Sequence, residues 1–310
     1  MKVFIAGATG LLGKRVVKLL LAGGHQVVGL ARSEANRALL ESLGAEARPG
    51  NLFDKNEMIA ATEGCEAILH LATKIPPKTR TTPKDWREND RIRTEGAANL
   101  TDAAIHHKMR LYLQQSILFI YGDQQGRVID SQTRQAKRQP FPLRSAVVME
   151  NIVNEKAGEQ GLPAVTLRFA GFYGPDSAQT QGMIQAVRKG KMPIIGRGDY
   201  YYNLIHLDDA ASAVAFAADN HERLMHQTHN VSDFHPATFA EVIRYLAELT
   251  GGRKPNHFPA WLARLFLGGA LVEVLTNSYQ NRTNTLAGWK PAYPSYQEGF
   301  EQVVSQINQT

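Results

Sequence analysis

Three glycines near the start of the chain form the first pattern that could do chemistry. Gly7, Gly10 and Gly13 stand three residues apart in the segment GATGLLG (7–13), directly after the apolar run at 3–5. In such a turn the first glycine permits a tight bend, the second lets the backbone approach a pyrophosphate, and the third allows a helix to pack closely on a strand. A helix that begins there offers free N–H groups and its dipole to phosphates. The segment therefore predicts a dinucleotide site, with a plain tight turn as the alternative.

The end of the second predicted strand decides between two dinucleotides. An acidic side chain at this place binds the ribose hydroxyls of NAD, whereas an arginine can pair with the 2′-phosphate of NADP. Here the strand ends on Ala31-Arg32-Ser33. Arg32 therefore favours NADP over NAD. The alternative is an exposed Arg32 with Glu34 on the ribose.

The order of the elements gives the glycine turn its place in the fold. In the first half of the chain, short apolar runs alternate with segments of helical periodicity. We predict strands at 3–6, 25–32, 66–72, 110–116 and 164–170. We predict helices at 11–21, 33–44, 54–64, 85–108 and 145–160. This alternation indicates an α/β fold, a doubly wound parallel sheet (Rossmann fold) with helices on both faces and ligands at the carboxyl ends of the strands.

The regular alternation of strands and helices ends after Gly171, where the turn-rich segment FYGPDSAQTQ (172–181) follows. We therefore expect a smaller C-terminal substrate lobe that is interleaved with the sheet domain. The dinucleotide-binding Rossmann domain is predicted at 1–170 and 203–232, and the substrate-binding lobe at 171–202 and 233–310. The third helix should carry a capping box from Asp54 and Glu57, and Asp208 and Asp209 should cap the helix that follows them.

Composition narrows the class of protein. A hydrophobic content of 43% in 310 residues can fill a core, and the single cysteine, Cys65, excludes an internal disulfide. The apolar stretch 261–275 is too short to span a bilayer. The net charge of +6 suits anionic small molecules, but the basic residues are spread along the chain. We expect a cytoplasmic protein with a small-molecule substrate and no nucleic-acid, membrane or metal partner. If the chain assembles, we expect a homodimer.

Nine ordered segments, spread over nearly the whole chain, resemble one superfamily. They are GATGLLG (7–13), GNLFD (50–54), HLAT (70–73), Asn89 with TEGAANL (94–100), QQSILFIYGD (114–123), LRFAGFYGP (167–175), NLIHLDDAA (203–211), NVSD (230–233) and GWKPAYP (288–294). In this order they resemble the extended short-chain dehydrogenase/reductases, the NAD(P)-dependent epimerase/dehydratase group.

The resemblance implies roles for individual residues. The residues implied to cradle the pyrophosphate are Thr9, Gly10, Leu11 and Leu12. Those implied to lie by the adenine and the ribose are Asn51, Leu52, Leu71, Ala72 and Thr73. Those implied to lie near or under the nicotinamide are Ser116, Phe169, Ala170 and Phe172. Arg197 is implied to reach a substrate. For Phe169 and Phe172, core filling is the alternative.

One departure from the superfamily concerns its Tyr-x-x-x-Lys dyad. The segment 140–163, where the dyad belongs, contains no tyrosine. Lys156 lies in the same predicted helix, but the expected lysine aligns near Ala146, and ten residues of helix turn Lys156 roughly 80° off that face. We predict that Lys156 faces solvent. The chain is therefore expected to be an atypical member that lacks the dyad.

Tyr121, five residues after Ser116, is the predicted substitute. A phenolate base would need its pKa lowered from about 10 to about 7, roughly 4 kcal/mol of stabilisation. A neutral phenol needs no such shift to hydrogen-bond a carbonyl oxygen. We therefore predict an NADP-dependent oxidoreductase that reduces a small carbonyl or enone compound, with Tyr121 contacting the substrate as donor and Ser116 assisting. A packed aromatic is the alternative for Tyr121.

Two other functions are considered for the whole protein. A non-catalytic NAD(P)-sensing regulator or scaffold is the first alternative, because some relatives that lack the dyad act as regulators. Sugar-nucleotide epimerisation or dehydration ranks below both, because the base that this chemistry needs is absent.

Overall fold

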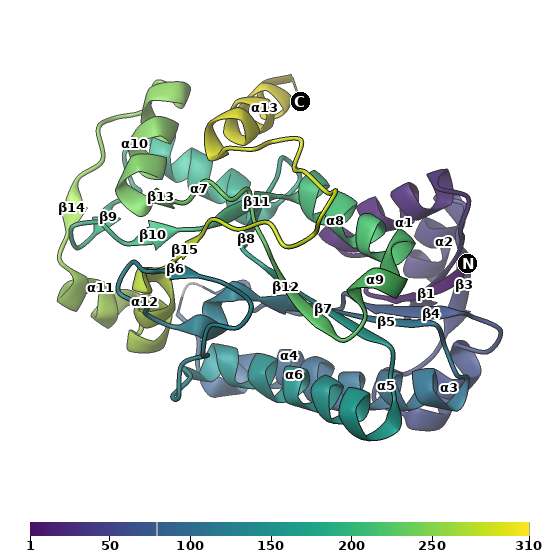
Figure 1. Ribbon diagram of the computed structural model, residues 1–310. Coiled ribbons are helices and arrows are strands. Elements are labelled where there is room, and N and C mark those ends of the chain that lie inside the picture. Colours follow the sequence, from purple (N-terminus) through teal and green to yellow (C-terminus); the bar gives the residue numbers. More distant parts are fainter. Residues whose placement is uncertain (79, 310) are drawn as a thin grey trace.

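A seven-stranded parallel sheet forms the centre of the structure, a computed structural model that describes residues 1–78 and 80–309 (Figure 1). The strands lie in the order β12-β7-β5-β4-β1-β2-β3. Their bounds are β1 (Lys2–Ala6), β2 (Gln26–Ala31), β3 (Glu46–Pro49), β4 (Ala67–His70), β5 (Leu111–Ile117), β7 (Ala164–Phe169) and β12 (Gln227–Val231). The strand order reverses between β1 and β4, which leaves a crevice at their carboxyl ends. The predicted doubly wound sheet is confirmed.

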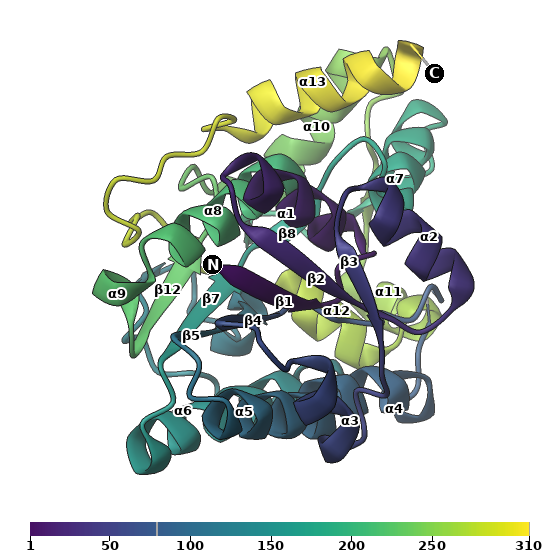
Figure 2. The same ribbon diagram turned by 90° about the vertical axis from the view of Figure 1, so that its right-hand side faces the viewer.

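Helices cover both faces of this sheet (Figure 2). On one face lie α1 (Leu11–Ala22), α2 (Glu34–Ser42) and α8 (Leu207–Asp219). On the other lie α3 (Lys55–Ala61), α5 (Ala97–His106) and α6 (Phe141–Gln160). Val3 and Ile5 belong to the core under α1 and α8, whereas Phe4 belongs to the core under α3 and α5. Because β1 is buried on both faces, its sequence is a continuous apolar run instead of an alternating one.

Several predicted elements differ from the observed ones. The predicted helix 85–108 consists of α4 (Pro83–Arg91), a π-helical turn (Ile92–Gly96) and α5. Two sheet strands, β3 and β12, were not predicted, because both are edge strands and carry polar residues. The capping box is half formed: Asp54 accepts from the Glu57 N–H, but the Glu57 carboxylate accepts from the N–H of Asn51.

Short strands and helices outside the sheet make up the rest of the chain. The strands pair as β8 (Gly171–Tyr173) with β11 (Leu204–His206), β10 (Tyr201–Tyr202) with β13 (Ala237–Thr238), β9 (Ile194–Ile195) with β14 (His257–Phe258), and β6 (Val128–Ile129) with β15 (Gln280–Asn281). The helices are α7 (Ala178–Arg188), α9 (His221–Leu224), α10 (Phe239–Thr250), α11 (Ala260–Leu267), α12 (Gly269–Thr276) and α13 (Tyr296–Gln309). The predicted division into a Rossmann domain and a lobe stays a proposal.

The apolar stretch 261–275 is divided between α11 and α12. Within 1–78 and 80–309, no helix combines the length and the apolar character that a membrane span needs.

Asp233, which follows β12, is a buried carboxyl group. It is 4% exposed, and its Oδ1 accepts a hydrogen bond of 3.0 Å from the N–H of His235. Its Oδ2 has no hydrogen-bond partner among the residues that the structure describes. Burial raises the pKa of Asp233 to about 8. Asp233 is therefore protonated in the folded protein near neutral pH.

This raised pKa makes the stability of the fold depend on pH. An unfolded aspartate has a pKa of about 4, so between about pH 4 and pH 8 the folded protein binds one more proton than the unfolded chain. The free energy of unfolding therefore falls as the pH rises through this range. We expect wild type to lose on the order of 2–4 kcal/mol more than Asp233→Asn between pH 5 and pH 8. Urea denaturation at several pH values measures this, and parallel curves for the two proteins would contradict it.

Candidate functional site

A cleft of about 470 Å³ lies at the carboxyl ends of β1 and β4, where the strand order reverses. Its lining residues come from the glycine turn, from the ends of β2, β4 and β5, and from the segments around β8 and α7. The predicted cofactor residues that line it are Gly7, Thr9, Gly10, Leu11, Leu12, Gly13, Arg32, Leu52, Leu71, Ala72, Thr73 and Phe172. The structure thus brings most of the predicted set together in one place.

The glycine turn leaves no room for side chains at two of its three glycines. Gly7 has φ +93°, and a Cβ there would lie 2.6 Å from the backbone N of Ala72. A Cβ on Gly13 would lie 2.0 Å from the carbonyl oxygen of Gly7. At Gly10 a Cβ would meet only the Gly7 oxygen, at 3.3 Å, because Gly10 faces the cleft. The turn therefore forms a cradle of bare backbone at the start of α1, which fits a pyrophosphate.

Basic side chains flank one end of the cleft. Arg32 lines both the cleft and a neighbouring hollow that Ser33, Glu34, Arg37 and Asn51 share. The Arg32 side chain is 59% exposed, and its nearest carboxylate, on Glu88, is 3.9 Å away. Glu34 is 86% exposed and lies 3.5 Å from Arg37. Because the Glu88 carboxylate is this distant, it would compete little with a phosphate in the hollow for the Arg32 guanidinium. Asn51 lines the hollow and not the cleft.

Ser116 and Tyr121 lie in the core and not at the cleft. The Ser116 hydroxyl donates to Glu150 Oε1 at 2.5 Å, and Ser116 is 1% exposed. The Tyr121 hydroxyl donates to Asn230 at 2.8 Å and accepts from Arg168 at 2.5 Å. Burial raises the pKa of Tyr121, against the opposing effect of Arg168. The geometry thus resembles the packed-aromatic alternative for Tyr121, and neither Ser116 nor Tyr121 lines the cleft.

A buried ion pair organises these two side chains. Arg168 of β7 donates to both carboxylate oxygens of Glu150 on α6, at 2.7 and 2.9 Å. Burial lowers the pKa of Arg168, but the hydrogen bonds and charge of Glu150 outweigh this effect and raise it. The same guanidinium holds Tyr121, and the same carboxylate holds Ser116. An arginine within the apolar strand 164–170 was the sequence signal for this pair, since such a charge needs a buried partner.

Three further predicted site residues lie away from the cleft. Phe169 and Ala170 are 0% and 5% exposed, and Phe169 packs against Phe172 with ring centroids 5.4 Å apart. Arg197 is 88% exposed and pairs with Asp199 at 2.6 Å, in a separate hollow beside Arg264. Phe169 therefore fills the core, whereas Phe172 also lines the cleft.

The prediction that Lys156 faces solvent needs correction. Its Nζ lies 2.8 Å from Asp102 on α5, and its side chain is 24% exposed. The position near Ala146, where the superfamily's lysine was expected, is fully buried. Lys156 therefore joins two helices on the outer face of the sheet domain and takes no part in the cleft.

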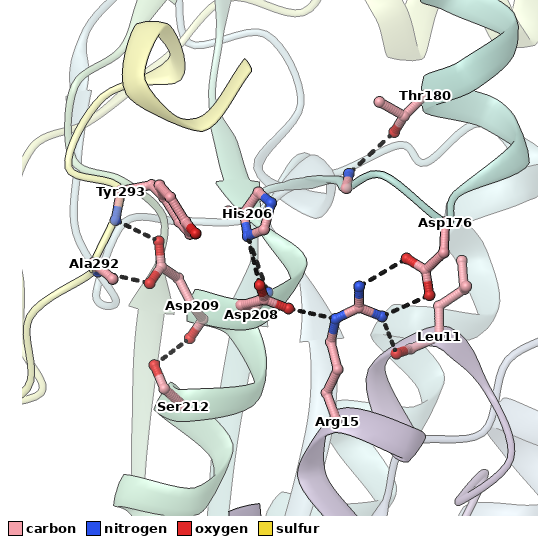
Figure 3. A network of polar contacts seen from close by, with 11 residues as sticks. Leu11, Arg15, Asp176, Thr180, His206, Asp208, Asp209, Ser212, Ala292 and Tyr293 are labelled. Carbon is pink, nitrogen blue, oxygen red and sulfur yellow. Dashed lines mark hydrogen bonds and ion pairs between the residues drawn. The ribbon is translucent and has the colours of Figure 1, made fainter. Parts of the chain in front are cut away.

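Arg15 of α1 holds together segments that the sequence analysis did not connect (Figure 3). Its guanidinium donates to both oxygens of Asp176, at 2.7 and 2.9 Å, and to Asp208 at 2.6 Å. Asp176 precedes Ser177, Ala178 and Gln179, which line the cleft. Arg15 thus fastens this lining segment to α1.

The caps predicted for α8 also differ from the observed contacts (Figure 3). His206, not an aspartate, caps the helix, because its Nδ1 accepts from the N–H of Asp208 at 3.2 Å. Asp209 accepts from the N–H groups of Ala292 and Tyr293, at 2.6 and 3.0 Å. It therefore ties the C-terminal segment to α8.

Two reductases are similar to this chain in sequence. A reductase of Streptomyces sp., the 3-diazoavenalumate denitrifying reductase, is 29% identical over 97% of this chain and 99% of its own length. The 2-alkyl-3-oxoalkanoate reductase of Shewanella oneidensis is 25% identical over 80% of this chain and 66% of its own length.

Solved structures share the fold at low sequence identity. A human epimerase family protein with NADPH has a TM-score of 0.82 and 18% identity, over 98% of this chain and 99% of its own. The UDP-glucose 4-epimerase of Thermotoga maritima with UDP-glucose has a TM-score of 0.79 and 19% identity, over 100% and 99%. The family described as the NAD dependent epimerase/dehydratase family matches residues 3–232, which include the glycine turn and all seven strands of the sheet. The chain belongs to this family.

Proposed function

We propose that the protein is an NADP-dependent oxidoreductase that reduces a small carbonyl or enone compound. The observation that carries the proposal is the cleft itself, with a cradle of bare backbone at the glycine turn and Arg32 at one end. The names of the two reductases from Streptomyces sp. and Shewanella oneidensis support reduction as the reaction. When bound, the nicotinamide ring supplies the hydride.

Arg32 is the basis for NADP in this proposal. The residues from 31 to 33 contain no carboxylate, and Glu34 is turned toward Arg37. A 2′-phosphate between Arg32 and Arg37 would gain charge-assisted hydrogen bonds, whereas a ribose hydroxyl would offer these two cations no negative charge. The surrounding charges therefore favour the phosphorylated dinucleotide.

In the proposed reaction, hydride from bound NADPH would add to the carbonyl carbon and the oxygen would take up a proton from water, so the side chains in the cleft need only bind that oxygen. Thr73, Gln115, Ser177 and Gln179 line the cleft, and each can donate a hydrogen bond to a carbonyl oxygen without any pKa shift. The proposal assigns no step to Ser116 or Tyr121, because both hydroxyls already have buried partners. No strong base is needed in this direction of the reaction.

A direct assay tests the reductase proposal. The purified protein is mixed with NADPH and a panel of small ketones, aldehydes and enones, and NADPH absorbance is followed. We expect consumption that depends on one class of carbonyl compound.

A non-catalytic NADP sensor is the second candidate, favoured by α6, which contains no tyrosine, and by the enclosed hydroxyls of Ser116 and Tyr121. Tight NADPH binding without turnover across the panel would support the sensor and contradict the reductase.

The Arg32 contact predicts the choice of dinucleotide. Arg32→Asp should lower the affinity for NADP⁺ by about 10- to 100-fold, because a charge-assisted contact is replaced by repulsion. NAD⁺ affinity should stay the same or rise. The control is Arg110→Asp, since Arg110 is similarly exposed, at 54%, but lies at the amino end of β5. Calorimetric titration measures all six affinities, and equal NADP⁺ and NAD⁺ affinities in wild type would refute the proposal.

Substitutions within the glycine turn separate binding from folding. Gly10→Val should fold but lose dinucleotide binding, because its side chain would occupy the cradle. Gly13→Val should lower the free energy of unfolding by about 3 kcal/mol or more, because its side chain would overlap the Gly7 carbonyl. Thermal melting and NADPH fluorescence titration distinguish the two variants. A folded Gly10→Val protein with wild-type affinity would show that the phosphates bind elsewhere.

A further inference from the structure

Gln115 is a polar side chain in the cleft whose oxygen lacks a partner. It is 8% exposed and lines the cleft near the carboxyl end of β5. Its Oε1 is buried and has no hydrogen-bond partner among the residues that the structure describes. Its neighbours on the strand, Gln114 and Ser116, face the opposite side of the sheet. There Gln114 forms a hydrogen bond with His70, and Ser116 forms one with Glu150. Of these three side chains, Gln115 alone lines the cleft.

The position of Gln115 along the cleft indicates which ligand group it meets. Arg32 marks one end, the glycine turn lies between, and Gln115 and Phe172 lie beyond the turn. A dinucleotide with its adenosine at Arg32 and its pyrophosphate at the turn would place its nicotinamide at Gln115. This assignment rests on the proposed function.

The chemistry of the two groups is complementary. A buried carbonyl oxygen without a partner costs about 1–3 kcal/mol, so a ligand that donates to it is favoured. The nicotinamide ring carries a primary carboxamide, whose N–H groups donate and whose oxygen accepts. The side-chain amide of Gln115 offers the matching acceptor and donor.

We propose that Gln115 Oε1 accepts a hydrogen bond from the carboxamide N–H of the nicotinamide and thereby orients the ring in the cleft. Gln115 is then a positioning residue for the cofactor. In this role it does not depend on the identity of the substrate.

The test compares two dinucleotides that differ at this one donor. NADP⁺ carries the carboxamide, and its 3-acetylpyridine analogue carries a methyl ketone with no N–H. We expect wild type to bind NADP⁺ about 3- to 10-fold more tightly than the analogue. In Gln115→Met, which keeps the length of the side chain but not the amide, the ratio of the two affinities should fall to about 1. Calorimetric titration measures the ratio without any turnover.

Two further variants make the result specific. Gln115→Glu keeps an acceptor at the same place and should keep the preference for NADP⁺. Gln139→Met is the matched control, because Gln139 is also 8% exposed with an unpartnered Oε1 but does not line the cleft. It should leave the ratio unchanged. Thermal melting verifies that each variant is folded.

The outcomes separate this inference from the proposed function. An unchanged ratio in folded Gln115→Met, or a wild-type ratio of about 1, would overturn the role of Gln115 while leaving NADP binding in place. A wild-type protein that binds neither dinucleotide would overturn the proposed function, and the role of Gln115 with it.

Discussion

The close approach of three backbone segments at the glycine turn is the constraint on which the site depends. The end of β1, the first turn of α1 and the residues after β4 meet so closely that a Cβ on Gly7 or Gly13 would overlap backbone atoms. This contact sets where α1 begins and points its N-terminus at the place where the strand order reverses. The cleft, its exposed backbone at the start of α1 and its two ends follow from that one junction.

Two charged networks join elements around this junction. Arg15 joins α1 to the segment at Asp176 and to the start of α8, so the residues after Asp176 that line the cleft are fastened to α1 (Figure 3). On the opposite face of the sheet, Glu150 and Arg168 join α6 to β7 and hold the hydroxyls of Ser116 and Tyr121. Removal of one partner of such a buried ion pair destabilises a fold by several kcal/mol, so this pair helps to hold α6 against β7. On the other face of β5, Gln115 lines the cleft.

The sequence could predict the parts of the fold that depend on local pattern. The glycine spacing, the apolar run of β1 and the arginine after β2 are local features, and the structure places all three as expected. The edge strands β3 and β12 lacked such a pattern, because their sequences, EARP and QTHNV, are mostly polar. The contacts of Arg15 with Asp176 and Asp208 join residues far apart in the chain, and no spacing rule predicts them.

The direction of single side chains at the end of β5 was the hardest feature to predict. Neighbouring residues of a strand face opposite sides, so a difference of one position decides whether a polar group meets a ligand or the core. The sequence pattern favoured Ser116, whereas the cleft is lined by Gln115. Tyr121 ends a short 3₁₀ turn (Leu118–Tyr121) that carries its side chain into the core instead of toward the crevice.

A crystal structure of the protein with NADP⁺ is the most direct test of the central claim that this cleft holds a phosphorylated nicotinamide dinucleotide. We expect the 2′-phosphate within hydrogen-bond distance of Arg32, the pyrophosphate at the start of α1, and the nicotinamide beside Gln115. A dinucleotide bound in the reverse direction, or one whose 2′-phosphate points away from Arg32, would contradict this expectation.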